Sequence, residues 1–151
     1  MIAFVFIVWH VFHMHGWFHA DAWMQRVAQA LGGGMFRAYN ATSTAAEAMQ
    51  MSSIVPILYA IGVLSCVFHL ANGLWTFGIT WGIWVTPQAQ RWANAFCLVF
   101  GLGLAAVSMG ALSGFTFVVR GKEKIESVRK IEDSMYEERV KVGQKPMDAI
   151  V

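Results

Sequence analysis

The sequence predicts an all-α protein whose helices form a transmembrane bundle. Of its 151 residues, 57% are hydrophobic and only 13% are charged, and the mean hydropathy is +0.51, which is too apolar for an ordinary soluble domain. The charges are also segregated, because five lie before residue 120 and the other fifteen lie in the last 32 residues. The chain therefore divides into an apolar membrane part, residues 1–119, and a charged, solvent-exposed tail, residues 120–151.

Apolar stretches that are long enough to cross a bilayer occur three times, at about residues 1–19, 53–84 and 92–119. The second stretch ends before Thr86-Pro87, which breaks the helix. Because only a short turn, residues 85–90, joins the second stretch to the third, these two helices should be antiparallel neighbours. The first stretch could instead be a signal peptide cleaved near Ala20, but it has no basic beginning and contains three histidines, so we interpret it as a spanning helix.

The region between the first and second stretches, residues 20–51, reads as a connector with one short surface helix at about residues 22–31. A run of three glycines, residues 32–34, follows that helix. No strand precedes this run and no Lys-Ser/Thr follows it, so it is not a phosphate-binding loop. We expect it to be a flexible link.

The charged tail contains two Glu-to-Lys pairs with the i,i+4 spacing that stabilises helices, Glu126–Lys130 and Glu137–Lys141. They predict a solvated helix that ends near Gly143 and Pro146.

The third stretch carries a series of small residues at near-helical spacing, formed by Gly103, Ala106, Gly110 and Gly114. Such a face lets a second helix or a cofactor approach the backbone closely. The sequence alone leaves both interpretations open.

The histidine at position 69 lies alone near the middle of the longest uncharged stretch, residues 48–90. Ionisable groups at membrane depth are costly and tend to mark function. The positions on its side of a helix are small or polar: Gly62, Ser65, Cys66, Asn72, Gly73, Thr76 and Thr80. A lone intramembrane histidine can simply bond to a neighbouring helix, but these small neighbours leave room for a large flat group such as a haem.

The segment GVLSCVFHLANGLWTFGITWGIWVTPQAQ, residues 62–90, resembles the fourth helix and following turn of the cytochrome b subunits of succinate dehydrogenases and fumarate reductases, of the five-helix, di-haem, b558 type. FVFIVWHVFH, residues 4–13, resembles the end of that family's third helix, and residues 92–119 resemble its fifth. The family's first two helices, each with a haem-ligating histidine, have no counterpart in this sequence. The resemblance therefore implies three spanning helices of an incomplete five-helix bundle.

By this resemblance, His69 is an axial ligand of the haem nearer the iron–sulfur subunit, and His10 is an axial ligand of the haem on the far side. The chain would then supply one iron ligand to each of two b haems. His13 and His15 lie about one turn further along and are expected near the membrane surface instead. The residues expected to face a haem beside His69 are Ser65, Asn72, Gly73 and Thr76.

The implied function is that of a non-catalytic membrane anchor in a succinate:quinone oxidoreductase, whose haems pass electrons from the iron–sulfur subunit to a quinone, commonly menaquinone. The implied partners are the flavoprotein and iron–sulfur subunits, the quinone and the lipid of a bacterial cytoplasmic membrane crossed several times; no nucleic acid is expected. The sequence has no dinucleotide fingerprint and no cysteine cluster for iron–sulfur centres. The alternatives are a haem-free anchor of the same complex and an unrelated three-helix transporter or scaffold.

Two criteria disagree about the orientation in the membrane. The positive-inside rule places the tail in the cytoplasm, because basic residues follow the third stretch at Arg120, Lys122, Lys124, Arg129 and Lys130. The resemblance implies the opposite, with the tail outside and residues 85–90 inside. We favour the resemblance, because the order of the haems relative to the soluble subunits fixes the helix directions.

Overall fold

The computed structural model describes residues 1–18 and 20–144, and within these residues the secondary structure is entirely helical. This confirms the predicted fold class. The α-helices are α1 (Ile2–His15), α2 (Asp21–Trp23), α3 (Ala41–Gln50), α4 (Ile54–Thr80), α5 (Pro87–Ser113) and α6 (Lys122–Lys141).

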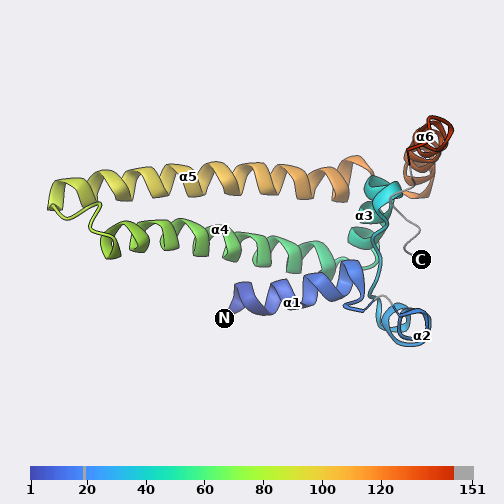
Figure 1. Ribbon diagram of the computed structural model, residues 1–151, viewed down its shortest axis with the longest axis horizontal. Coiled ribbons are helices and arrows are strands. Elements are labelled where there is room, and N and C mark those ends of the chain that lie inside the picture. Colours follow the sequence, from blue (N-terminus) through green and yellow to red (C-terminus); the bar gives the residue numbers. More distant parts are fainter. Residues whose placement is uncertain (19, 145–151) are drawn as a thin grey trace.

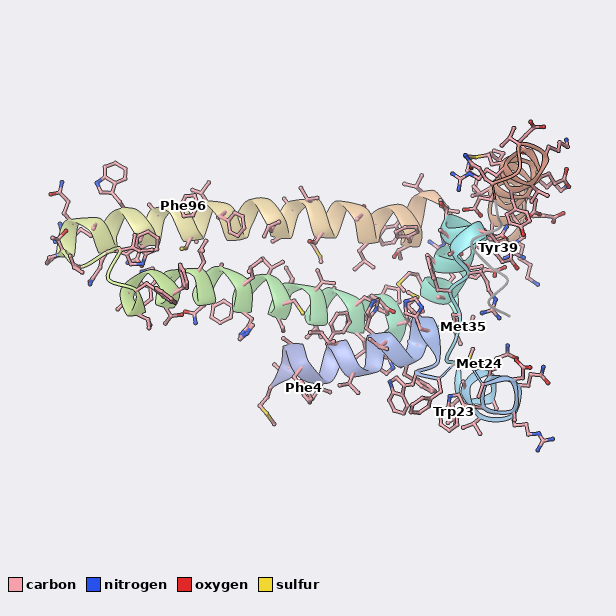
Figure 2. All side chains as sticks on the ribbon, viewed as in Figure 1. Phe4, Trp23, Met24, Met35, Tyr39 and Phe96 are labelled. Carbon is pink, nitrogen blue, oxygen red and sulfur yellow. The ribbon has the colours of Figure 1, made fainter. Side chains whose placement is uncertain are left out.

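Helices α4 and α5 form a long antiparallel pair that dominates the molecule (Figure 1). At about 1.5 Å per residue, the 27 residues of α4 extend about 40 Å, more than the roughly 30 Å hydrocarbon core. Both helices are long and apolar enough to span a membrane, α5 together with the π-helical turn η4 (Gly114–Val118). Most of their large apolar side chains are exposed, such as Phe96 on the outer face of α5 (Figure 2), whereas a core helix of a soluble protein would bury them.

The turn between these helices shows why α5 begins earlier than the sequence suggested. Helix α4 ends at Thr80, seven residues before Pro87, so Pro87 does not end it. Pro87 occupies the first turn of α5, where its missing N–H is not needed. The Thr86 side chain caps that turn, because its hydroxyl accepts a hydrogen bond from the Ala89 N–H at 3.2 Å. The expected start at residue 92 was therefore five residues too late.

Helices α4 and α5 pack closely at Gly101, where an added Cβ would lie 3.2 Å from the Ala71 Cβ. Added Cβ atoms at Gly103, Gly110 and Gly114 would meet nothing within 4 Å in the described part of the chain, so these three glycines do not pack against α4. Packing against a further helix and close approach of a cofactor both stay predictions for this face. Gly101 instead lies on the α5 face that contacts α4.

Helix α1 is shorter than the apolar run suggested. Its 14 residues end at His15, and the following Gly16 takes the left-handed conformation (φ 75°) and donates its N–H to the Phe12 carbonyl at 2.7 Å. At about 21 Å it falls short of the hydrocarbon thickness, so the described residues contain two helices of spanning length and not the expected three. It runs antiparallel to the first half of α4 (Figure 1).

The connector is more ordered than expected. A helical segment covers Asp21–Leu31, which confirms the predicted surface helix. The glycine run is not a free link, because Gly33 and Gly34 are buried and donate hydrogen bonds to the Ala28 carbonyl (2.7 Å) and the Phe12 carbonyl (3.1 Å). Helix α3 was not predicted from the sequence. Most of its residues are buried.

Helix α6 packs across α3 at the end of the molecule opposite the α4–α5 turn (Figure 1). The Glu132 carboxylate accepts hydrogen bonds from the N–H groups of Thr42 (2.6 Å) and Ser43 (3.2 Å), which are free at the start of α3. Arg129 forms an ion pair with Glu47 at 2.6 Å. The tail helix is therefore attached to the membrane part by specific polar contacts.

The ion pairs predicted within the tail are present in part. Lys130 pairs with Glu126 at 3.2 Å, as expected. Lys141 pairs with Glu138, three residues away, and not with Glu137. Pro146, where the helix was expected to have ended, lies outside the described residues, as does His19.

Candidate functional site

The first part of the site is a pair of histidines on α1 that share one tyrosine of α4. The Tyr59 hydroxyl lies 3.1 Å from His10 Nδ1 and 2.9 Å from His13 Nδ1. His10 and His13 are three residues apart, so they lie on the same face of α1 and reach the same partner. The phenol thus joins two imidazoles from one helix to the other helix.

Aromatic rings enclose these three side chains. Phe6 stacks on His10 with ring centroids 5.7 Å apart, and Trp9 stacks on His13 at 5.0 Å with the planes 12° from parallel. The Phe6 and Trp9 rings also contact the Tyr59 ring edge-on. Gly62 of α4 makes room for Phe6, since an added Cβ would overlap that ring. The packing of α1 on α4 therefore holds the imidazole planes in place.

His13 is buried, with 4% of its surface exposed, whereas His10 is only half-buried. His13 Nε2 is also buried and has no hydrogen-bond partner among the described residues. The His13 ring is thus covered by Trp9 and Tyr59, and its expected position near the membrane surface stays a prediction. His15, in contrast, is exposed at the end of α1, with its ring against Phe36.

The second part of the site is the exposed face of α4 around His69. Gly62 and His69 are seven residues apart, or about two helical turns, so His69 lies on the face against which α1 packs. Helix α1 covers this face only as far as Gly62, because Met1 and Ile2 lie beside Leu58 and Ile61. Beyond that level the His69 ring is exposed, and no residue in the described part of the chain bonds to it.

The residues beside His69 form a surface with small side chains and satisfied hydroxyls. A Cβ added at Gly73 would meet nothing within 4 Å. The Ser65 hydroxyl donates to the Ile61 carbonyl at 2.8 Å, and the Thr76 hydroxyl donates to the Asn72 carbonyl at 2.7 Å. Because both hydroxyls bond within α4, the face needs no polar partner of its own and can accept an apolar one.

Asn72 lies at the edge of this surface. It lines the groove between α4 and α5, of about 510 Å³, together with Trp75, Asn94 and mainly apolar side chains. The Trp75 Nε1 atom is buried and has no hydrogen-bond partner among the described residues. Of the residues expected to surround His69, Ser65, Gly73 and Thr76 therefore share its face, while Asn72 turns toward α5.

The two histidine positions lie at different depths along α4. Tyr59, which marks the level of His10, and His69 are ten residues apart, so the two levels are about 15 Å apart along the helix axis. Sequence reasoning selected His10 and His69 but missed Tyr59 and the buried His13. The available signal was that Tyr59 is the one tyrosine in an apolar stretch, where a hydroxyl needs a partner.

Comparison with known proteins places the chain in a family. The chain is similar to the succinate dehydrogenase cytochrome b558 subunit of Bacillus subtilis (strain 168), with 33% identity over 115 residues. The chain belongs to the succinate dehydrogenase cytochrome b family. No protein-family model matches it, and no solved structure does.

The alignment covers 76% of this chain and 48% of the Bacillus subtilis relative, so the chain spans about half the length of that cytochrome b558 subunit. Membership of the cytochrome b family agrees with the two long apolar helices and identifies the chain as a membrane protein.

Proposed function

We propose that this chain holds b haems in the membrane anchor of a succinate:quinone oxidoreductase, with His10 and His69 as axial ligands of two different haem irons. The observation that carries the proposal is the placement of these histidines on one side of α4, at depths about 15 Å apart, in a chain of the cytochrome b family. Two imidazoles at two depths suit two carriers arranged across a membrane.

The residues present fit a haem at each position. His10 has its Nδ1 bonded to Tyr59, which leaves Nε2 to bind iron, as metal-bound histidines commonly do. His69 projects from a face where Gly73 would allow a flat group to approach the backbone. Among the described residues no cluster of three or more metal-binding side chains exists, and a haem iron requires only axial ligands from the protein.

A bound b haem would supply a one-electron carrier whose potential depends on its axial ligands and their partners. The chain contributes the imidazoles, the small residues Ser65, Gly73 and Thr76 beside His69, and Asn72 at the edge of that face. It also excludes water from His10 through the rings of Phe6 and Tyr59. We propose that these groups position the haems between the iron–sulfur subunit and a quinone, in particular menaquinone.

The proposed partners are the flavoprotein and iron–sulfur subunits, and the proposed location is a bacterial cytoplasmic membrane. With His69 assigned to the haem nearer the iron–sulfur subunit, the α4–α5 turn faces the cytoplasm and α6 faces the outside. This assignment is supported by the positions of the histidines, because His10 lies near the α3–α6 end and His69 lies nearer the turn.

The experiment is to isolate the chain from its native membrane by an affinity tag and to add succinate. We expect the flavoprotein and iron–sulfur subunits to co-purify, and two low-spin b haems to be present. At least one of these haems should be reduced by succinate. Copurification of the soluble subunits without any b-type absorption would identify a haem-free anchor, and absence of both would contradict the proposed function.

A further inference from the structure

The Tyr59 hydroxyl forms hydrogen bonds with two imidazole nitrogens, and it cannot play the same role in both. A tyrosine hydroxyl carries one proton, so it can donate to only one of His10 Nδ1 and His13 Nδ1. The other imidazole must donate its N–H to the tyrosine oxygen. These two distances alone allow two arrangements: either His10 donates to Tyr59 and Tyr59 donates to His13, or both donations are reversed.

The proposed function removes this ambiguity. If His10 binds iron through Nε2, the proton of its neutral ring is on Nδ1, and His10 must donate to the Tyr59 oxygen. The Tyr59 hydroxyl then donates to His13 Nδ1, which acts as the acceptor. Each hydrogen bond strengthens the one before it, because an oxygen that donates its own proton becomes a better acceptor.

His13 is otherwise difficult to explain. Its ring is 4% exposed, and its Nε2 has no partner among the described residues. A buried nitrogen without a partner is costly, and a phenylalanine stacked on Trp9 would avoid that cost. The nitrogen of His13 that does have a partner is Nδ1, which is bonded to the Tyr59 hydroxyl.

We propose that Tyr59 and His13 are positioning residues for the haem ligand His10. This inference rests on the proposed function. The Tyr59 oxygen fixes the His10 tautomer and ring orientation and, by accepting a hydrogen bond from the Nδ1–H, makes the imidazole a more basic ligand that favours ferric iron. His13 fixes the Tyr59 hydroxyl in turn. The pair therefore lowers the reduction potential of the haem bound at His10.

The experiment is a redox titration of the assembled complex carrying Tyr59→Phe, His13→Phe or both. Tyr59→Phe should favour reduction of the His10 haem roughly tenfold, a rise of about 59 mV for one electron, and should change its ferric low-spin EPR signal. His13→Phe should raise the potential by a smaller amount. The double variant should show the same reduction potential as Tyr59→Phe alone, because both changes interrupt the same series of hydrogen bonds.

Two controls separate a positioning role from general damage. The haem at His69 should keep its potential in every variant, which reports that the protein is folded. Tyr39→Phe removes the same hydroxyl from a tyrosine whose ring packs at a tilt against Tyr136 of α6, and should change neither haem. Unchanged potentials in Tyr59→Phe, or additive shifts in the double variant, would overturn the inference.

The His10→Ala variant, titrated in parallel, distinguishes this inference from the proposed function. Loss of one haem in His10→Ala, with an unchanged potential in Tyr59→Phe, would refute only the positioning role. Retention of both haems in His10→Ala would refute the ligand assignment and, with it, the role of Tyr59 and His13.

Discussion

Gly73, one helical turn from His69, borders the space that a haem would occupy. In the described structure a Cβ at this position meets nothing, so Gly73→Leu should leave the protein fold intact, with a change in unfolding free energy within about 0.5 kcal/mol. If the face binds haem, however, the added side chain should displace it. We expect selective loss of the His69 haem, measured as the haem content of the purified complex.

Two variants serve as controls for Gly73→Leu. Gly103→Leu places the same side chain at an equally open position on α5. Leu70→Ala alters the residue next to His69 but on a different side of α4, about 100° away. Both should retain two haems; equal losses in all three variants would show that the His69 face has no special role.

The residues of the site differ in how far the sequence revealed them. His10 and His69 are predicted as site residues because each lies in a segment that resembles a known pattern. Tyr59 and His13 were missed because their importance arises only when α1 packs against α4 and brings together residues more than forty positions apart. A periodic pattern within one helix does not contain that information.

At the scale of elements, the attachment of α6 to α3 depends on Glu132. Its carboxylate caps two N–H groups of α3, at Thr42 and Ser43, and helix caps of this kind contribute about 0.5–2 kcal/mol. Glu132→Ala should therefore destabilise the α3–α6 region by about that amount. The measurement is amide hydrogen exchange, which should accelerate at Thr42 and Ser43.

The matched control is Glu126→Ala, which removes a glutamate from the same helix. Glu126 pairs only with the exposed Lys130, and such surface pairs contribute little. Exchange at Thr42 and Ser43 should not change in this variant. If hydrogen exchange accelerated equally in Glu126→Ala and Glu132→Ala, the start of α3 would depend on the stability of α6 as a whole and not on the Glu132 carboxylate.

The long apolar helices and the surface helix could be predicted because local composition and periodicity determine them. The start of α5 was misplaced, since Pro87 can end one helix or begin another, and only the Thr86 cap decides between these outcomes. Helix α3 was missed because it is short and rich in small residues. Its stability comes from burial and from Glu132, about ninety residues away in sequence.

At the scale of the whole molecule, the proposed order of the two haems predicts the orientation in the membrane. We expect the α4–α5 turn inside and α6 outside, against the positive-inside rule. The Gln88→Cys variant should react with a membrane-impermeant thiol reagent only in inverted membrane vesicles. The Ser127→Cys variant should react only in intact cells whose cell envelope outside the cytoplasmic membrane is permeable to the reagent. The unmodified protein, with Cys66 and Cys97, gives the background; the reverse labelling pattern would show that the basic residues determine the topology.

The central claim is that His69 is an axial haem ligand, and chemical rescue tests it most directly. His69→Gly removes the imidazole and leaves space for a free imidazole molecule beside the equally small Gly73. The purified complex should lose the low-spin signal of one haem and regain it when imidazole is added, while the His10 haem is unaffected. Retention of both low-spin haems in His69→Gly without imidazole would contradict the account.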